Sequence, residues 1–166
     1  MSFDVGDKVV YPHHGAAIIE RRETMTVMGE ERDYLVLKIA YGDLTLKVPA
    51  DAADEVGLRD VIDQDEVEEV FTVLRKVGAR EPTNWSRRYK NHVEKLKSGD
   101  IYQVAEVVRN LSLREKDKHL SAGEKRLLLS ARRVLVSELI FAIDISEEEA
   151  EVKLDEVLAM SSSPAT

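Results

Sequence analysis

The sequence predicts an α+β protein in two domains, a small five-stranded β-barrel followed by a compact domain of five helices. From residue 5 to residue 48, short apolar runs with β-branched residues are broken by Gly15, Gly29 and Gly42, which is the spacing of strands and turns. After residue 62 the apolar residues recur at every third and fourth position, as on one face of a helix. Capping residues precede these later apolar runs, which supports a helical second half.

The barrel is expected within residues 1–52. The predicted strands are residues 8–11, 16–22, 24–28, 33–39 and 45–48, and the predicted turns are residues 12–15, 28–31 and 41–43. Five short strands in about fifty residues indicate an SH3-like or Tudor-like barrel. The interior of such a barrel is filled by side chains, so it binds partners more often than it encloses an active site. An edge strand that stays open can take up a strand of another chain.

Residues 53–62 are predicted to be a partly helical connection, residues 63–160 the helical domain, and residues 161–166 a disordered tail without any pattern. The five helices are expected to begin at Asp63 with Glu66, at Thr83 or Asn84, at Asp100 with Gln103, at Ser121 with Glu124, and at Ser146 with Glu149. Their apolar stripes predict a compact bundle.

The charge of the chain is segregated along the sequence. The whole chain carries 24 basic and 32 acidic residues, a net charge of −8. Residues 75–133 hold 16 basic and seven acidic residues, a net charge of +9, between acidic flanks. A basic block in an acidic chain indicates a surface for phosphates, and the acidic flanks would limit indiscriminate DNA binding.

Composition also bounds the environment of the protein. The chain has no cysteine, which excludes disulfides, thiolate metal sites and a cysteine nucleophile and fits a reducing compartment. The first residues lack a basic start and an apolar segment, and no apolar run approaches the roughly 18 residues of a membrane span. We therefore expect a cytoplasmic monomer without membrane contact.

The only tryptophan, Trp85, is predicted at the start of a helix and has three basic neighbours. These neighbours are Arg87, Arg88 and Lys90. A flat apolar side chain flanked by cations suits a nucleic-acid groove. Trp85 also shares helical spacing with Tyr89, Val93 and Leu96, and such a stripe is more often core than binding site. The residues alone leave both interpretations open and favour the core.

Motifs for enzymatic chemistry are missing from the sequence. Adjacent His13 and His14 would point to opposite faces of a strand and have no further ligand at metal-binding spacing, so a turn or surface role is predicted. His92 and His119 are predicted to lie isolated on polar helix faces. The chain contains no nucleotide-binding loop, serine-hydrolase elbow or zinc-protease motif. We expect neither enzymatic activity nor a cofactor or metal.

Two stretches, V-G-D-K-V-V-Y-P-H-H-G-A-A at 5–17 and E-P-T-N-W-S-R-R-Y-K at 81–90, resemble the CarD/CdnL family. Y-L-V-L-K at 34–38 and L-S-A-G-E-K-R at 120–126 extend the resemblance over nearly all of residues 1–160. It implies a Tudor-like domain, similar to the polymerase-interacting domain of transcription-repair coupling factors, that binds the β subunit of bacterial RNA polymerase. It further implies a helical domain that meets promoter DNA at the upstream edge of the transcription bubble and stabilises the open complex.

The resemblance also implies roles for single residues. Trp85 matches the family's wedge at the upstream fork, which reverses the core interpretation. The basic residues expected to face DNA are Arg87, Arg88, Lys90, Lys125 and Arg126.

On the polymerase side, Lys47 retains a positive charge where the family usually has arginine. Met25 stands where actinobacterial relatives often carry arginine, so bidentate carboxylate pairing is lost there and apolar contact is expected instead. Strand pairing by the backbone of Thr26, Val27 and Met28 is then the expected main attachment.

Overall fold

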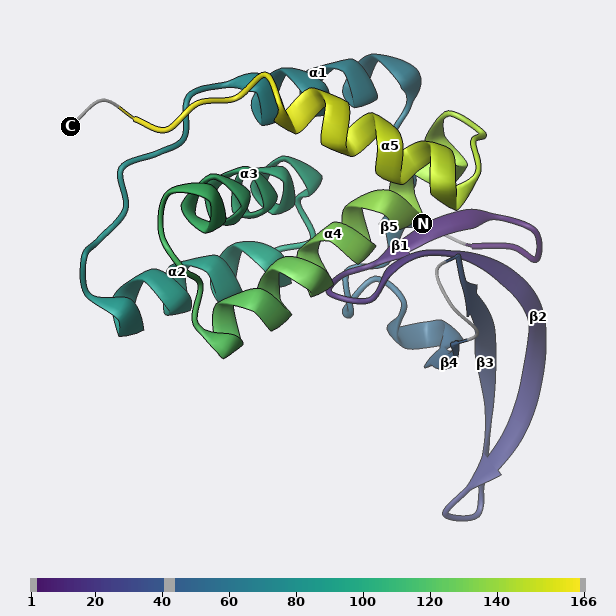
Figure 1. The fold of residues 1–166 in the computed structure, drawn as a ribbon. Helices are drawn as coiled ribbons and strands as arrows, with labels where there is room; N and C mark the ends of the chain where they lie inside the picture. Colours follow the sequence, from purple (N-terminus) through teal and green to yellow (C-terminus); the bar gives the residue numbers. More distant parts are fainter. Residues whose placement is uncertain (1–2, 41–43, 165–166) are drawn as a thin grey trace.

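The computed structural model describes residues 3–40 and 44–164, which form a five-stranded sheet followed by five α-helices (Figure 1). The strands are β1 (Lys8–Tyr11), β2 (Gly15–Val27), β3 (Glu30–Ile39), β4 (Thr45–Pro49) and β5 (Arg59–Asp60). The helices are α1 (Gln64–Arg75), α2 (Trp85–Lys97), α3 (Ile101–Asp117), α4 (Ala122–Ala142) and α5 (Glu147–Leu158), and a short 3-10 helix spans Ala50–Ala52. The predicted α+β class is confirmed, and the turn predicted at 41–43 lies outside the described residues.

The sheet is open rather than closed into a barrel. Its strands are antiparallel, in the order β4-β3-β2-β1-β5. Closure would require the two outer strands to pair with each other, but among the described residues β4 pairs only with β3 and β5 only with β1. The predicted Tudor-like barrel is therefore not confirmed.

Two of the predicted strands are halves of one strand. Residues 16–22 and 24–27 both belong to the 13-residue β2, which has a bulge between Ile19 and Arg21 and visibly curves (Figure 1), whereas Met28, predicted as the end of the second strand, lies in the turn. The fifth strand, β5, lies instead in the predicted connection 53–62. Ala53 and Leu58 of this connection are buried in the core of the sheet, so these residues pack as part of the first domain.

The β2–β3 hairpin projects beyond the rest of the molecule (Figure 1). β1 pairs only with residues 15–18 of β2, and β4 pairs only with residues 34–38 of β3. Within the described part of the chain, no strand pairs with the outer edge of β2 from Arg21 to Val27. The open edge considered from sequence is therefore present along half of the longest strand.

The helix starts follow the predicted capping residues. The capping boxes of Asp63 with Glu66, Ser121 with Glu124 and Ser146 with Glu149 all form both reciprocal bonds. Asn84, and not Thr83, caps α2 by accepting a bond from the Arg87 amide at 3.0 Å. Asp100 caps α3 through the Tyr102 amide. The helices enclose one apolar core, separate from that of the sheet.

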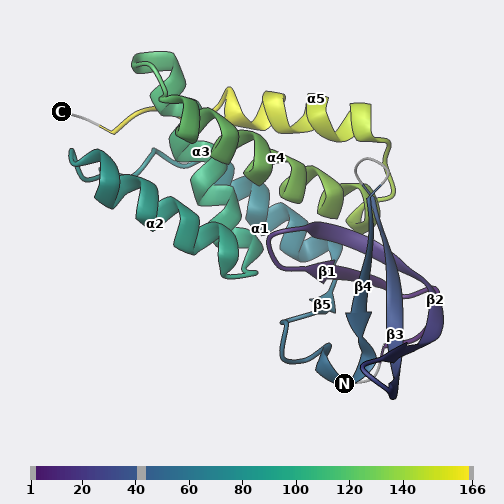
Figure 2. The same cartoon turned by 90° about the horizontal axis from the view of Figure 1, so that it is seen from below.

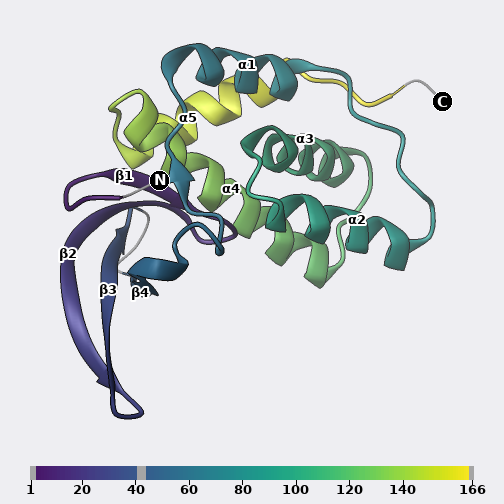
Figure 3. The same cartoon turned by 180° about the vertical axis from the view of Figure 1, so that it is seen from behind.

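The sheet meets the helical domain where the β1–β2 turn lies beside α4 (Figures 2 and 3), and polar contacts join the two parts. Arg59 of β5 makes two 2.8 Å bonds to the fully buried Glu138 of α4, which also accepts the Ile62 amide at 2.9 Å. At the preceding residue of α4, Ser137 Oγ accepts a hydrogen bond from the Ala16 amide at 2.8 Å. A Cβ at Gly15, whose φ is 102°, would lie 2.6 Å from this oxygen, so only glycine lets the β1–β2 turn approach α4 this closely. Buried, satisfied bonds of this kind fix the orientation of the two parts.

The segment that follows α5 lies against the helical domain. The Gly78 amide donates to the Ser162 carbonyl at 2.8 Å, and Ser163 Oγ bonds to Asp117. Residues 161–164 of the tail that was expected to be disordered therefore have defined contacts, while 165–166 lie outside the described residues. None of the helices in the described ranges is long and apolar enough to span a membrane.

Candidate functional site

The first candidate surface lies where the N-termini of α2 and α4 meet. Trp85 is the first residue of α2, and its indole Nε1 donates a 3.0 Å hydrogen bond to Oγ of Ser121, the N-cap of α4. The Trp85 ring stacks on Tyr89 one turn later, with centroids 4.9 Å apart and planes inclined by 12°. The Trp85 side chain is nevertheless 44% exposed. Since Tyr89 covers one face of the indole, the exposed surface belongs to the other face and the ring edges.

The 120–126 stretch, L-S-A-G-E-K-R, packs against this aromatic pair. Ser121 both caps α4 and accepts the indole bond. A Cβ at Gly123 would lie 3.4 Å from Tyr89 Cε2 and 3.6 Å from Trp85 Cζ2. Gly123 therefore lets the helix backbone approach the two rings, and the motif is explained by local packing as well as by charge.

Arg88 is not part of the exposed surface, contrary to the sequence prediction. Its side chain lies inside the domain, 3% of the residue is exposed, and Nε is 3.2 Å from Oε2 of Glu124. Nη1 donates to the carbonyls of Pro82 and Thr83 at 3.2 and 3.3 Å. Arg88 thus holds the segment before α2 against the start of α4 and does not face solvent.

Glu124, 2% exposed, is the partner of Arg88 and has two structural roles. It completes the capping box of α4 with the Ser121 amide, and its other oxygen receives Arg88. Burial alone would raise the pKa of this carboxyl, but the bonds from Arg88 and Ser121 outweigh burial and lower the pKa below its ordinary value. Glu124 therefore stays ionised at neutral pH and anchors α2 to α4.

Four of the predicted DNA-facing cations are exposed on the two helices that meet at the aromatic pair. Arg87 and Lys90 lie in the first two turns of α2, and Lys125 and Arg126 lie in the first two turns of α4. Within the described residues, none of the four has an ion-pair partner. Cations near helix N-termini are unfavourable to the helix dipole. These charges therefore add nothing evident to the fold and are available for an anionic partner.

The second candidate surface lies on the projecting hairpin and β4. The five residues predicted for it are Met25, Thr26, Val27, Met28 and Lys47, of which the first four lie consecutively at the end of β2 and in its turn. Lys47 Nζ is 3.0 Å from Glu23 Oε2 and 3.9 Å from Met25 Sδ, so it shares one face of the sheet with them.

The sequence did not reveal Glu23 as a member of this surface. Hydrogen bonds from Lys47 and then from Arg21 lower its pKa, so it is ionised at neutral pH. The sequence does indicate that residues 23 and 25 lie on the same face of a strand, because they are two positions apart. Their proximity to Lys47 could not be predicted, because it depends on how β3 pairs with β2 and β4.

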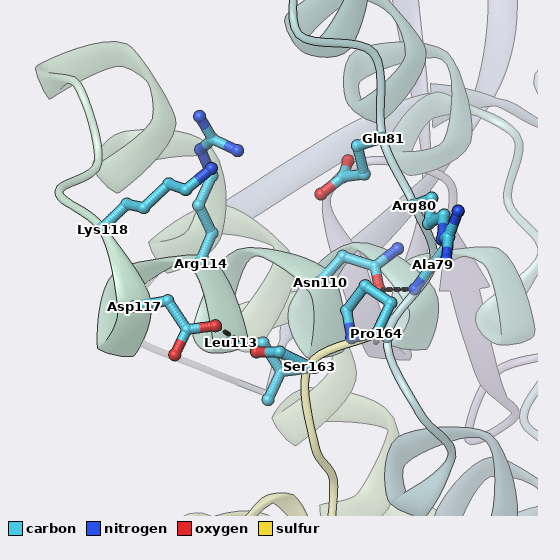
Figure 4. Close-up of a pocket in the computed structure, with 11 residues that line it drawn as sticks. Ala79, Arg80, Glu81, Asn110, Leu113, Arg114, Asp117, Lys118, Ser163 and Pro164 are labelled. Carbon is cyan, nitrogen blue, oxygen red and sulfur yellow. Dashed lines mark hydrogen bonds between the residues drawn. The ribbon is translucent and has the colours of Figure 1, made fainter. Parts of the chain in front are cut away.

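A surface pocket of about 390 Å³ lies between the segment before α2, helix α3 and the chain end (Figure 4). Arg114 of α3 and Lys118, which follows α3, line one side of it, Arg80 and Glu81 the other, and Ser163 and Pro164 close one end. His92 of α2 lies next to Glu81, and the sequence prediction placed it wrongly on a polar helix face. His92 is buried, with Nε2 2.6 Å from Oε2 of Glu81. Glu81 and His92 brace the start of the 81–90 stretch.

The described ranges contain no group of three or more histidine, cysteine, aspartate or glutamate side chains that could hold a metal ion. His13 and His14 lie exposed at the β1–β2 turn. The prominent features of the molecule are thus two surfaces, one aromatic and cationic and one with an open strand edge.

Comparison with known proteins covers both parts of the chain. The family model for the CarD-like/TRCF RID domain matches residues 3–62, and the model for the CarD C-terminal domain matches residues 69–155. A curated relative, named "Putative transcription factor YdeB" in Bacillus subtilis strain 168, is 33% identical over 147 residues. These residues span 89% of this chain and 96% of the relative.

Proposed function

This chain belongs to the CarD family, and from that membership we propose that it binds the β subunit of RNA polymerase and stabilises the open promoter complex. The matched domains and the curated relative support a transcription regulator that binds RNA polymerase. The observation that best supports this proposal is the half-exposed indole of Trp85 where α2 meets α4, two helices that carry four exposed cations without ion-pair partners among the described residues.

Trp85 has the properties of a wedge at the upstream fork of the bubble. Its free face can stack on a base, while Tyr89 and Ser121 hold the indole so that little side-chain freedom is lost on contact. Inserting an apolar side chain at a step that is already open costs less than unstacking closed duplex. Such a contact therefore favours the melted state over the closed state.

The cations explain why the contact does not need a sequence motif. Arg87, Lys90, Lys125 and Arg126 are suited to phosphates, whose contacts position a protein without reading bases. Four such contacts in a chain of net charge −8 support only weak binding to free duplex. Docking on polymerase would raise the local DNA concentration to the order of millimolar, at which weak contacts suffice.

The polymerase side of the proposal rests on the open edge of β2. A strand of the β subunit can pair with the backbone from Arg21 to Val27 without requiring particular side chains. Lys47 lies on the adjoining face and would meet an acidic partner. The part-buried Arg59–Glu138 bonds and the buried Ala16–Ser137 bond hold this surface in a fixed relation to the Trp85 surface. Docking of the hairpin on polymerase would therefore also position the Trp85 surface.

Lys47→Glu is expected to weaken binding to polymerase by about ten-fold, because a favourable contact with an acidic partner becomes repulsive. The measurement is isothermal titration with the isolated β lobe. The double variant Glu23→Lys/Lys47→Glu serves as the matched control, since it restores the internal ion pair with its charges exchanged. Full recovery of affinity in the double variant would show that the loss arose inside the protein and not at the interface.

Single substitution of Arg87, Lys90 or Lys125 by Ala should lower occupancy of polymerase–promoter complexes to a similar extent at different promoters. The slope of affinity against salt should also flatten by about one unit per lost contact. Lys97→Ala, at the other end of α2 from Trp85, also removes an exposed cation and should change neither quantity. A loss confined to some promoters would instead indicate base reading.

Two rival functions are separated by one gel-shift experiment with forked promoter DNA, run with and without polymerase. A free-standing architectural DNA-binding protein would bind the fork equally well in both cases. A protein-only adaptor would join the polymerase complex just as well when Trp85 is replaced. We expect binding that depends on polymerase and is weakened by loss of Trp85.

A further inference from the structure

The tip of the β2–β3 hairpin is a two-residue turn in a conformation that its first residue does not favour. Val27 and Glu30 form the last pair of the hairpin, so Met28 and Gly29 make the turn. Their φ angles are 53° and 82°, both in the left-handed region. Two-residue turns with both φ angles positive prefer Asn-Gly or Asp-Gly, because asparagine, aspartate and glycine tolerate this region best. Methionine at the first position is strained.

Contacts inside the protein do not explain the methionine. The Met28 side chain is 99% exposed, so it packs against almost nothing in the described chain. Val27 beside it is 40% exposed, which makes the tip an apolar point on an otherwise charged arm that includes Glu30, Glu31 and Arg32. A large apolar side chain that is both fully exposed and in an unfavourable backbone conformation gives the isolated protein no evident stability.

We propose that Met28 is an anchor residue, which inserts its side chain into an apolar cavity of RNA polymerase next to the strand that pairs with the β2 edge. The inference rests on the proposed function and deepens it, because it names a contact beyond backbone pairing and beyond the charge of Lys47. Met28 directly follows Val27, where the open edge of β2 ends. A polymerase strand paired with this edge would therefore bring the polymerase surface beside that strand close to Met28.

The chemistry of methionine fits this role. Its unbranched, polarisable side chain adapts to irregular apolar cavities, and burial of its apolar area offsets the rotamer freedom that this exposed side chain loses on contact. Anchors of this kind carry a large share of binding energy at protein interfaces. The partner cavity must therefore be apolar and roughly the size of one methionine side chain.

The test compares three substitutions at Met28 for melting temperature and for affinity to core RNA polymerase. Met28→Asn and Met28→Gly should suit the turn, so Met28→Asn is expected to raise the melting temperature by about 1–4 °C. Both substitutions should weaken binding by about ten-fold or more, because the apolar contact is removed. Met28→Leu keeps an apolar side chain and should retain affinity to within about three-fold while leaving the turn strained. Met160→Asn, at an exposed methionine following α5, is the control and should leave affinity unchanged.

A variant that is at least as stable as the wild type and yet binds polymerase more weakly would establish the anchor, since damage to the fold could not explain the loss. Unchanged affinity of Met28→Asn, with wild type binding normally, would overturn the inference and leave the proposed function standing. Absence of polymerase binding by the wild type would overturn both. Equal losses for Met28→Leu and Met28→Asn would exclude an apolar cavity as the partner.

Discussion

Glu124→Ala is expected to destabilise the helical domain by about 3–5 kcal/mol, because it leaves the charge of buried Arg88 without its partner. The same change removes half of the capping box of α4 and the carboxylate 3.8 Å from Arg114 Nε. A loss of this size is a large part of the total stability of an ordinary domain. Thermal or urea unfolding, monitored by circular dichroism, measures it directly.

The chain contains a matched control for this prediction. Glu149 occupies the same capping-box position in α5 as Glu124 does in α4, but it is exposed and the structure gives it no arginine partner among the described residues. Glu149→Ala should therefore cost only about 1 kcal/mol. Similar losses for the two variants would mean that the cap, and not the buried ion pair, accounts for the effect.

The pH dependence of stability should follow the same carboxyl. The folded-state pKa of Glu124 is lowered from its ordinary value of 4.5, so its contribution is fully present above that value. It is lost as pH falls through the folded-state pKa. The difference in stability between wild type and Glu124→Gln should accordingly shrink below about pH 4.5, whereas a difference independent of pH would contradict the ionised Glu124.

Local signals were sufficient to predict where the helices begin. Each cap involves residues two or three positions apart, as Ser121 with Glu124 does, and therefore depends on no distant part of the fold. The basic block brings two of its segments together in space, because Ser121, shortly before Lys125 and Arg126, bonds to Trp85 at the start of α2. The Trp85–Ser121 bond joins residues that are 36 positions apart, and no periodic pattern in the sequence predicts such a contact.

Errors in the prediction arose where distant residues decide the outcome. Helical spacing places Arg88 and His92 on the face of Leu96, yet charged and polar side chains are rarely fully buried unless paired. Their burial depends on Glu124 and Glu81, which are supplied by other segments. The errors in the predicted sheet also arose from contacts between distant residues. The bulge after Ile19 lets one strand continue where the sequence predicts two, and closure depends on where β5 pairs.

Trp85→Ala is expected to shorten the lifetime of the open promoter complex by about ten-fold or more, while costing the free protein only about 1–2 kcal/mol. The stability loss is modest because the substitution removes one aromatic stack, with Tyr89, and one hydrogen bond, to Ser121. A fully buried tryptophan would cost about 3–5 kcal/mol. Open-complex decay after heparin challenge and thermal melting, measured on the same variant, give the two quantities.

Two further variants distinguish a wedge from general loss of structure. Trp85→Phe keeps the ring that stacks on Tyr89 but loses the indole Nε1–H, and should recover part of the lifetime because a wedge needs apolar area more than a donor. Leu129→Ala truncates an exposed apolar residue of α4, which is 50% exposed and does not belong to the aromatic pair. This control should leave the lifetime of the open complex unchanged. A drop in stability of 3 kcal/mol or more for Trp85→Ala, with normal decay of the open complex, would return Trp85 to a purely structural role. Since Tyr89 and Ser121 already fix the indole in the free protein, we expect the opposite result: a small change in folding and a large change in the complex.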